Sequence, residues 1–292
     1  MQPPGPLLDA LRGVTWPARR PARGASAGTH RSRLRGVSAE FTEYRPYRQG
    51  DDPRRLDWRL LARTDRAYLR ITSDRATLGT VLLVVASASM AYPAATRGKW
   101  EQACRIAIGL AAVAHAAGDP VGVVVPAEGG IAALAPRTRR GVVGEVARVL
   151  DAVRPGGSAP LAPALRHVRA GHRVAIVSDF LGDADALLRV AAERASGGGD
   201  VVAVHVVSPE EREGPRDDIL ATDPENPAVR RPLVEATRPA YRAAFAEWRA
   251  ALARAWRAAG ATFVEVGSDE PAAAGVRRIA RPAGAPVAEH AR

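Results

Sequence analysis

TVLLVVAS, residues Thr80 to Ser87, is the stretch of sequence that decides the fold. It is almost wholly apolar, and a run without alternating polar positions is typical of a strand buried on both faces in a parallel sheet. Further strands and amphipathic helices are expected in alternation, with strands at 121–125, 173–178, 200–207 and 262–266 and helices at 99–117, 141–153, 161–169, 183–195 and 239–259. This alternation predicts an α/β fold with a doubly wound, mostly parallel sheet flanked by helices.

Composition divides the chain into segments. Residues 1–27, rich in proline, glycine and arginine, are expected to form a flexible leader. Residues 28–75 form an arginine-rich extension, which we expect to pack against the edge of the sheet, and residues 76–280 form the α/β domain. Within that domain, residues 208–238 are expected to form a long polar insertion with short paired strands. After the domain, residues 281–292 are expected to form a frayed tail.

The charge balance is strongly basic. The chain has 292 residues, of which 47% are hydrophobic, and its 42 Lys+Arg against 31 Asp+Glu give a net charge of +11. Lys99 is the only lysine. An arginine bias with abundant alanine is consistent with a GC-rich coding sequence. The alternative is attraction toward an acidic partner, nucleic acid or an anionic membrane surface.

The cysteine content and the apolar segments bear on where the protein is expected to reside. Its one cysteine, Cys104, excludes an intramolecular disulfide, and its spacing among apolar residues favours a packing role. No segment resembling a signal peptide is visible, and the longest apolar run, around Val81–Ala86, is too short to span a bilayer. We therefore expect a cytoplasmic protein without a membrane span.

A second stretch, residues 28–71, is dense in groups that need particular partners: GTHRSRLRGVSAEFTEYRPYRQGDDPRRLDWRLLARTDRAYLRI. Asp51 and Asp52 can face Arg54 and Arg55 across a turn that the neighbouring glycine and proline favour. One interpretation is a surface turn held by ion pairs. The other is a recognition surface of guanidinium and aromatic groups on a fixed loop. The residues preferred for that surface are Asp51, Asp52, Arg54, Arg55, Asp57 and Trp58.

This second stretch resembles the signature of the domain-of-unknown-function 58 family, in the ordered pattern from HRSRLRG through EFTEYRPY and GDDPRRLDWR to LLAR. The resemblance continues in LLVVASASM, in VAIVSDFLGD and from HVVSPEE onward, and covers about residues 28–280. It implies a von Willebrand factor A-like fold. It also implies a protein partner, a MoxR-type AAA+ ATPase, because members of the family are often encoded near one.

The implied fold places a divalent-metal site, the metal-ion-dependent adhesion site, after its first core strand, with an Asp-x-Ser-x-Ser pattern. Ser87 and Ser89 match the two serines, and Asp179 matches a later aspartate, but Val85 replaces the first aspartate and Ala159 replaces a threonine. Mg²⁺ prefers several oxygen ligands, including carboxylates. We therefore expect a degenerate site that is metal-free or binds Mg²⁺ weakly, with Asp179 hydrogen-bonded to Ser87, Ser89 or nearby amides.

Catalysis is not favoured by the residue patterns. A metal-dependent hydrolase would need carboxylates such as Glu40, Asp51, Asp52 and Asp57 to hold Mg²⁺ near a phosphate. Each of them has an arginine within a few residues that can satisfy it instead. The spacings typical of metalloproteases and P-loops are absent, and the six histidines are scattered.

Binding to a protein is the function that the family resemblance implies. We expect a non-enzymatic interaction module, an adaptor or partner of a MoxR-like AAA+ ATPase in a chaperone-like assembly. Its surface would combine the GDDPRRLDW turn with the loops around Ser87 and Asp179. The alternative is a basic nucleic-acid-binding protein, although acidic residues are interleaved among the arginines and no recognition motif is present.

Overall fold

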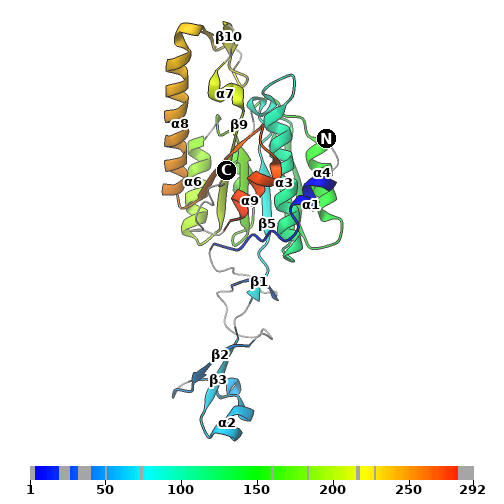
Figure 1. The fold of residues 1–292 in the computed structure, drawn as a ribbon, viewed down its shortest axis with the longest axis vertical. Coiled ribbons are helices and arrows are strands. Elements are labelled where there is room, and N and C mark those ends of the chain that lie inside the picture. The colour runs from blue at the N-terminus through cyan, green and yellow to red at the C-terminus, as the bar shows by residue number, and fades with distance from the viewer. Residues whose placement is uncertain are drawn as a thin grey trace, which may run out of the picture.

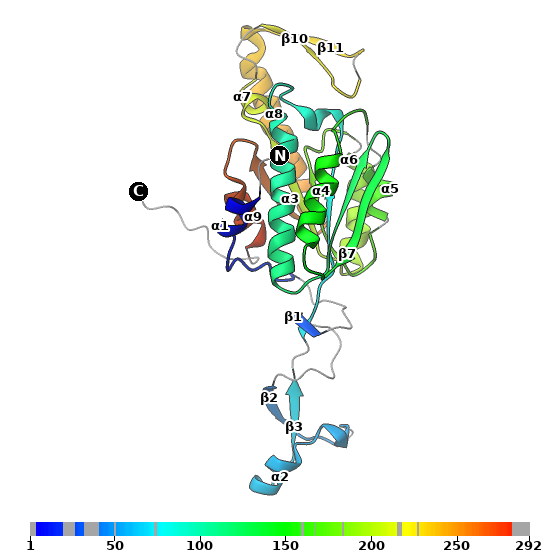
Figure 2. The ribbon, with the colours of Figure 1, turned by 90° about the vertical axis from the view of Figure 1, so that its right-hand side faces the viewer.

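A computed structural model describes residues 4–19, 27–31, 41–49, 51–72, 75–158, 161–166, 168–182, 184–214, 218–226 and 228–281. Its main body is a six-stranded sheet with helices on both faces (Figures 1 and 2). The strand order is β12-β9-β8-β5-β6-β7, and only β7 runs antiparallel to its neighbour within this sheet. The strands are β5 (Thr80–Val84), β6 (Val121–Ala127), β7 (Gly130–Arg137), β8 (Arg173–Ser178), β9 (Val201–Val207) and β12 (Thr262–Gly267). The α/β class and mostly parallel sheet expected from the sequence are confirmed.

Strand β5 lies in the middle of the sheet because it is apolar on both faces. All of its residues are buried, and Leu82 pairs with Val123 of β6 and Ala175 of β8. Leu82 and Val84 face one hydrophobic cluster, whereas Val81 and Leu83 face the other. Edge strand β7 instead alternates exposed and partly buried residues, as a strand covered on one face does.

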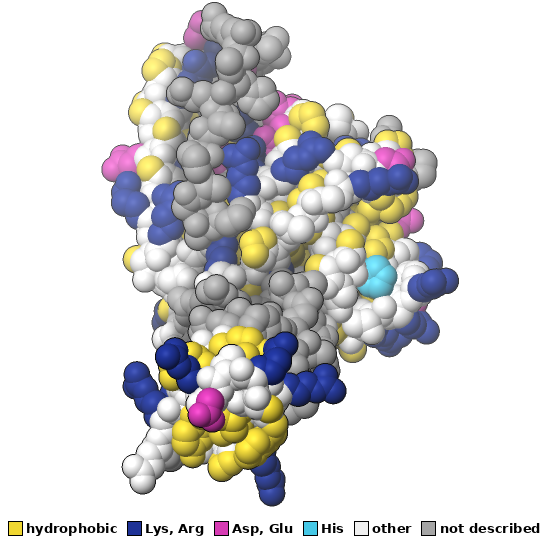
Figure 3. Space-filling view, turned by 60° about the horizontal axis from the view of Figure 1, so that its bottom comes forward, with side chains coloured by type: hydrophobic (Ala, Val, Ile, Leu, Met, Phe, Trp, Pro, Cys, Tyr) yellow, Lys and Arg dark blue, Asp and Glu magenta, His cyan; other side chains and the backbone are white. Residues whose placement is uncertain are grey.

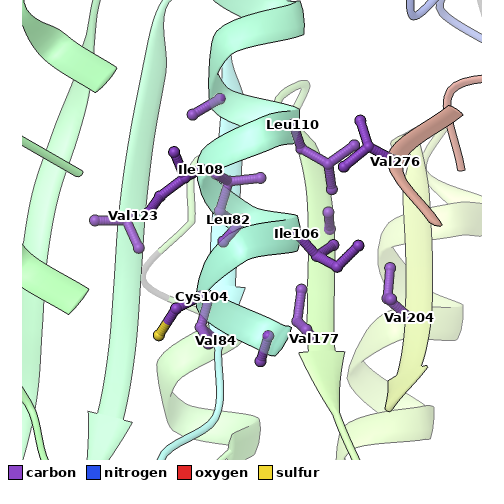
Figure 4. Packing of buried hydrophobic residues seen from close by; sticks show 14 of the residues in the cluster. Leu82, Val84, Cys104, Ile106, Ile108, Leu110, Val123, Val177, Val204 and Val276 are labelled. Carbon is purple, nitrogen blue, oxygen red and sulfur yellow. The ribbon is translucent and has the colours of Figure 1, made fainter. Parts of the chain in front are cut away.

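Two layers of helices cover the sheet. One face carries α1 (Gly5–Ala10), α3 (Gly98–Ala116), α4 (Val142–Ala152) and α9 (Ala272–Ala280). Figure 4 shows Ile108 of α3 beside Leu82 and Val123 of the sheet, and Leu110 beside Val276 of α9, and burying each such side chain stabilises the fold by about 1.5–3 kcal/mol. The other face carries α5 (Leu161–Arg166), α6 (Ala184–Ser196) and α8 (Arg238–Ala258).

The expected flexible leader is packed against the body over residues 4–19. Leu11 and Trp16 are buried, and helix α1 contacts α3 and α9. The Arg173 guanidinium lies 4.1 Å from the centre of the Trp16 ring and donates a hydrogen bond to the Trp16 carbonyl at 3.0 Å. The flexible-leader prediction is therefore wrong for these residues, because composition alone does not reveal a partner so distant in sequence.

The arginine-rich extension does not cover the sheet edge as expected. It contains β1 (Ala27–Arg31) paired with β4 (Arg75–Ala76), and β2 (Phe41–Pro46) paired with β3 (Tyr68–Thr72). Between β2 and β3 lie the 3-10 helix η1 (Pro53–Arg55) and helix α2 (Trp58–Thr64). Figures 1 and 2 show β2, β3 and α2 projecting beyond the end of the sheet where β5 begins. We call the described residues 41–49 and 51–72 the projecting module.

The polar insertion forms a hairpin at the opposite end. Strand β10 (Ile219–Thr222) pairs with β11 (Arg230–Leu233), next to the short helix α7 (Pro209–Glu213) and η3 (Glu235–Thr237). Paired strands in this insertion were expected and are present. Within the described ranges, none of the helices combines the length and apolarity that crossing a bilayer requires.

Candidate functional site

A cluster of buried polar residues at the carboxyl end of the sheet, called the crevice below, brings together Ser87, Ser89 and Asp179 of the sequence prediction. The chain leaves β5 toward β6 on one side, whereas β8 pairs with β5 on the other, so the strand order reverses between β5 and β8. Ligands of open α/β sheets bind at such a switch point. Ser87 follows β5 and Asp179 follows β8, and both are buried. Position 85 offers only a valine, also buried, whose amide donates to the Val177 carbonyl.

Lys99, which the sequence analysis did not assign to this site, provides its central cation. It is the second residue of α3, and its side chain is 0% exposed. Its ammonium lies 2.7 Å from Oδ2 of Asp179 and 2.5 Å from Oε1 of Glu211. Burial lowers the pKa of Lys99, but the charges of Asp179 and Glu211 outweigh it, so the pKa is raised overall. The ammonium is therefore charged at neutral pH.

Glu211 is held in place by the start of helix α7. Ser208 and Glu211 form a capping box, in which the Ser208 amide donates to Oε2 of Glu211 at 2.9 Å and the Glu211 amide donates to Oγ of Ser208 at 3.2 Å. The other carboxylate oxygen accepts from Lys99. The Tyr241 hydroxyl of α8 also donates to the Glu211 carbonyl at 2.8 Å. Helix α7 thus presents one oriented carboxylate to the crevice.

The serine pair faces a different carboxylate. The hydroxyls of Ser87 and Ser89 are 2.9 Å apart, and Ser89 donates to Oε1 of Glu225 at 3.0 Å. Glu225 lies in the connection between β10 and β11. Burial raises the pKa of Glu225, and the negative charge of Asp179 adds to that shift against the opposing serine hydrogen bonds.

The expected partners of Asp179 need a correction. Its Oδ2 accepts from the Lys99 ammonium rather than from Ser87 or Ser89, and its Oδ1 accepts from the Leu181 amide at 3.4 Å. A charged donor is the stronger partner for a buried carboxylate. The prediction of a bond to a nearby amide agrees with the Leu181 contact.

The residues of the crevice do not fit a divalent cation in this arrangement. Asp179 and Glu211 both neutralise Lys99, and a metal ion placed between them would meet the ammonium. In the part of the chain that the structure describes, no group of three or more His, Cys, Asp or Glu side chains could hold a metal ion. Position Ala159 of the sequence prediction lies outside the described residues.

The acidic residues of the GDDPRRLDW turn bind neighbours within the projecting module. Oδ1 of Asp51 accepts from the Arg45 guanidinium at 2.7 Å, and Oδ2 accepts from the Arg48 amide at 2.8 Å. The hydrogen bond from Arg45, with that from the Arg48 amide, lowers the pKa of Asp51. Asp52 accepts from the backbone amide of Arg54 at 3.0 Å. The contact of Asp52 across the turn therefore uses the Arg54 backbone rather than the predicted guanidinium, and Asp51 pairs instead with Arg45 of β2.

Asp57 fixes the helix that carries the exposed tryptophan. Its Oδ1 caps the first turn of α2, accepting from the amides of Arg59 at 3.1 Å and Leu60 at 3.0 Å. The Tyr44 hydroxyl of β2 donates to Oδ2 at 2.8 Å. The next residue, Trp58, is 63% exposed. A rigidly capped helix start thus presents a large aromatic side chain outward.

Exposed arginines lie on both sides of this tryptophan in the sequence. Arg54, Arg59 and Arg63 are exposed, and Arg55 ends η1. Between residues 41 and 72 there are eight arginines against five acidic residues. Figure 3 shows hydrophobic side chains bordered by basic ones on the part of the molecule that comes forward at its lower end.

The structure separates the two parts of the expected interaction surface. The projecting module lies beyond the amino end of β5, whereas Ser87 and Asp179 lie beyond the carboxyl ends of β5 and β8 (Figure 1). The prediction of one combined surface is therefore wrong, because the extension joins the sheet at the end of β5 opposite to Ser87.

Sequence reasoning missed Lys99, Glu211 and Glu225. Two signals were available for the first two. A single lysine among many arginines is unusual, and Ser208-Pro209-Glu210-Glu211 has the spacing of a capping box. Nothing in the sequence indicated that the hairpin turn brings Glu225 to Ser89.

Comparisons with known proteins show which family this chain belongs to. The model of the family described as "Protein of unknown function DUF58" matches residues 43–254. The uncharacterized protein Rv1480 of Mycobacterium tuberculosis (strain ATCC 25618 / H37Rv) is 30% identical, over 90% of this chain and 85% of the relative.

Among solved structures, BatB from Bacteroides thetaiotaomicron has a TM-score of 0.44 and 18% identity, over 69% of this chain and 96% of that chain. The SpRpn10 VWA domain has a TM-score of 0.39 and 11% identity, over 69% of this chain and 94% of that chain. The family match covers most of the chain and includes both the projecting module and the crevice, so the protein belongs to the DUF58 family.

Proposed function

We propose that this protein is a non-enzymatic protein–protein interaction module of the cytoplasm, an adaptor or partner of a MoxR-like AAA+ ATPase in a chaperone-like assembly. The observation that carries the proposal is Trp58, 63% exposed at the start of a capped helix and flanked by exposed arginines. Tryptophan, tyrosine and arginine are the residues that most often dominate the binding energy of protein interfaces. The identity of the ATPase partner follows from the family resemblance.

The projecting module has the rigidity that such a surface needs. Asp51, Asp52 and Asp57 bind backbone amides of the turn and of α2, so each fixes local backbone. Ordering a loop on binding lowers affinity, and a pre-ordered loop avoids that loss. These same bonds use the carboxylates that a metal-dependent hydrolase would need, which supports the non-enzymatic proposal.

The charge of the module specifies the partner surface. With eight arginines against five acidic residues between 41 and 72, the module that presents Trp58 has a net positive charge. We therefore expect a partner surface with an apolar pocket bordered by aspartate or glutamate.

Binding of Trp58→Ala to a purified MoxR-type ATPase from the same genome tests this proposal. Leu220→Ala is a matched control, because Leu220 is 59% exposed at the other end of the molecule. We expect Trp58→Ala to weaken binding at least about tenfold, as loss of a central aromatic anchor does, and Leu220→Ala to leave it unchanged. Equal affinity of wild type and Trp58→Ala would contradict the proposed surface.

Nucleic-acid binding is the second candidate, favoured by the same arginines beside an exposed aromatic ring. Single strands bind such surfaces through phosphate contacts and base stacking. A salt series with a single-stranded oligonucleotide separates the candidates. Affinity that falls steeply with salt and is lost in Trp58→Ala would favour nucleic acid, and no binding at low salt would favour the protein partner.

A further inference from the structure

The Lys99 ammonium joins three separate elements at the switch point. Lys99 lies in the first turn of α3, Asp179 follows β8, and Glu211 belongs to α7. The three side chains are 0%, 3% and 14% exposed. A buried ammonium needs such compensation, because an isolated charge is strongly unfavourable in a protein interior. The single lysine of the chain therefore has a fixed partner set.

The oxygen atoms around this ammonium resemble the ligand set of a hard cation. Two carboxylate oxygens lie 2.7 Å and 2.5 Å from Nζ, close to the range of about 2.3–2.6 Å for Ca²⁺–oxygen bonds. The hydroxyls of Ser87 and Ser89 and the carboxylate of Glu225 form the adjoining part of the crevice. Two carboxylates thus share the positive charge of Lys99, and Glu225 binds the serine pair beside them.

We propose that Lys99 is a resident cation that occupies the place of a divalent metal ion, and that removing its ammonium leaves the carboxylates of Asp179 and Glu211 open to Ca²⁺ or Mn²⁺. The ammonium holds α3, α7 and the end of β8 in one arrangement whatever the supply of metal. Any partner that binds at the carboxyl end of the sheet should therefore bind equally well with and without divalent cations. This inference does not depend on the Trp58 surface.

The wild-type protein allows a direct test, because one lysine gives one side-chain signal. In protein labelled with [15N]lysine, we expect a single Nζ resonance, protonated and slowly exchanging at neutral pH and unchanged by millimolar Mg²⁺ or Ca²⁺. A resonance that exchanges as rapidly as free lysine, or that shifts saturably with either ion, would overturn the proposal.

Lys99→Ala tests the second half of the proposal. Alanine removes the charge and leaves space, so calorimetric titration should show Ca²⁺ and Mn²⁺ binding at least tenfold tighter than in wild type. Adding Asp179→Asn should abolish that binding. Arg105→Ala is the matched control, because Arg105 lies on the same helix and pairs with Glu101 at the surface, and it should bind no cation.

Each outcome of the titration is decisive. A folded Lys99→Ala protein that binds no divalent cation would overturn the proposal, and so would a wild type that binds equally well. If Lys99→Ala unfolds, Ca²⁺ or Mn²⁺ should restore its melting transition, and failure of both ions to do so would count against the proposal.

Discussion

Lys99→Met tests whether the buried ammonium stabilises the crevice. Methionine keeps most of the aliphatic chain and removes the charge, so Asp179 and Glu211 lose their counter-ion. Removing one partner of a buried ion pair typically lowers the unfolding free energy by about 3–5 kcal/mol. Because Asp179 is 3% and Glu211 14% exposed, only Glu211 regains some water, and we expect a loss of about 3 kcal/mol.

Urea unfolding at pH 7 measures this loss in a double-mutant cycle of wild type, Lys99→Met, Asp179→Asn and the combined variant. The combined variant should lose less than the sum of the two single variants, because Asp179→Asn removes a charge that Lys99→Met leaves uncompensated. The matched control is Arg105→Met, which breaks the exposed pair with Glu101 and should lose about 1 kcal/mol or less.

The pH dependence of stability in Lys99→Met independently tests whether buried carboxylates have lost their counter-ion. In Lys99→Met, two negative charges are buried without their counter-ion, which is unfavourable unless a proton neutralises one of them. The stability of the variant relative to wild type should therefore rise as pH falls from 7 toward 5. Two results would refute this reasoning. One is a loss of unfolding free energy below about 1 kcal/mol in Lys99→Met at pH 7. The other is a combined variant whose loss equals the sum of the losses in Lys99→Met and Asp179→Asn.

Other predictions concern the strand edge, the projecting module and the N-terminal segment. Burial alone would raise the pKa of Glu265, but hydrogen bonds and charges from His205 and Arg249 lower it to about 2. The ionised Glu265 side chain therefore stabilises the fold above pH 4.5, and this contribution is lost as pH falls toward 2. In Glu265→Gln, the free energy of unfolding should therefore fall less between pH 4.5 and pH 2 than in wild type, by at most about 3 kcal/mol. A pH dependence identical to that of wild type would contradict this. Asp57→Ala removes the cap of α2 and should destabilise it by about 1 kcal/mol, seen as faster amide exchange and a lower melting temperature; if neither changes, the cap has no such role. Trp16→Ala should lower the unfolding free energy by about 3–5 kcal/mol, whereas an unchanged melt would restore the flexible-leader prediction.

The core of the fold was predictable because its signal is local. TVLLVVAS and RVAIVS are continuous apolar runs, and strands β5 and β8 form there with every residue buried. Their ends fixed the positions of Ser87 and Asp179 at one edge, because parallel strands place their carboxyl ends together. Helix α3 followed from the periodicity of its apolar residues.

The remaining features depend on contacts between distant parts of the chain. Trp16 packs on Arg173, and Ser89 bonds Glu225 from the far hairpin, and neither pairing leaves a pattern in nearby sequence. Lys99 was not predicted as a site residue for the same reason, because its partners Asp179 and Glu211 are distant in sequence. The direction of the projecting module depends on how the chain enters β5, which composition does not determine.

Hydrogen-exchange mass spectrometry of the chain with and without a MoxR-type ATPase tests most directly where the partner binds. We expect the ATPase to slow amide exchange across η1 and α2, residues 53–64, and to leave α7 and residues 218–226 unchanged. Protection confined to the carboxyl-end crevice, with residues 53–64 unaffected, would contradict the assignment of Trp58 and its arginines as the binding surface.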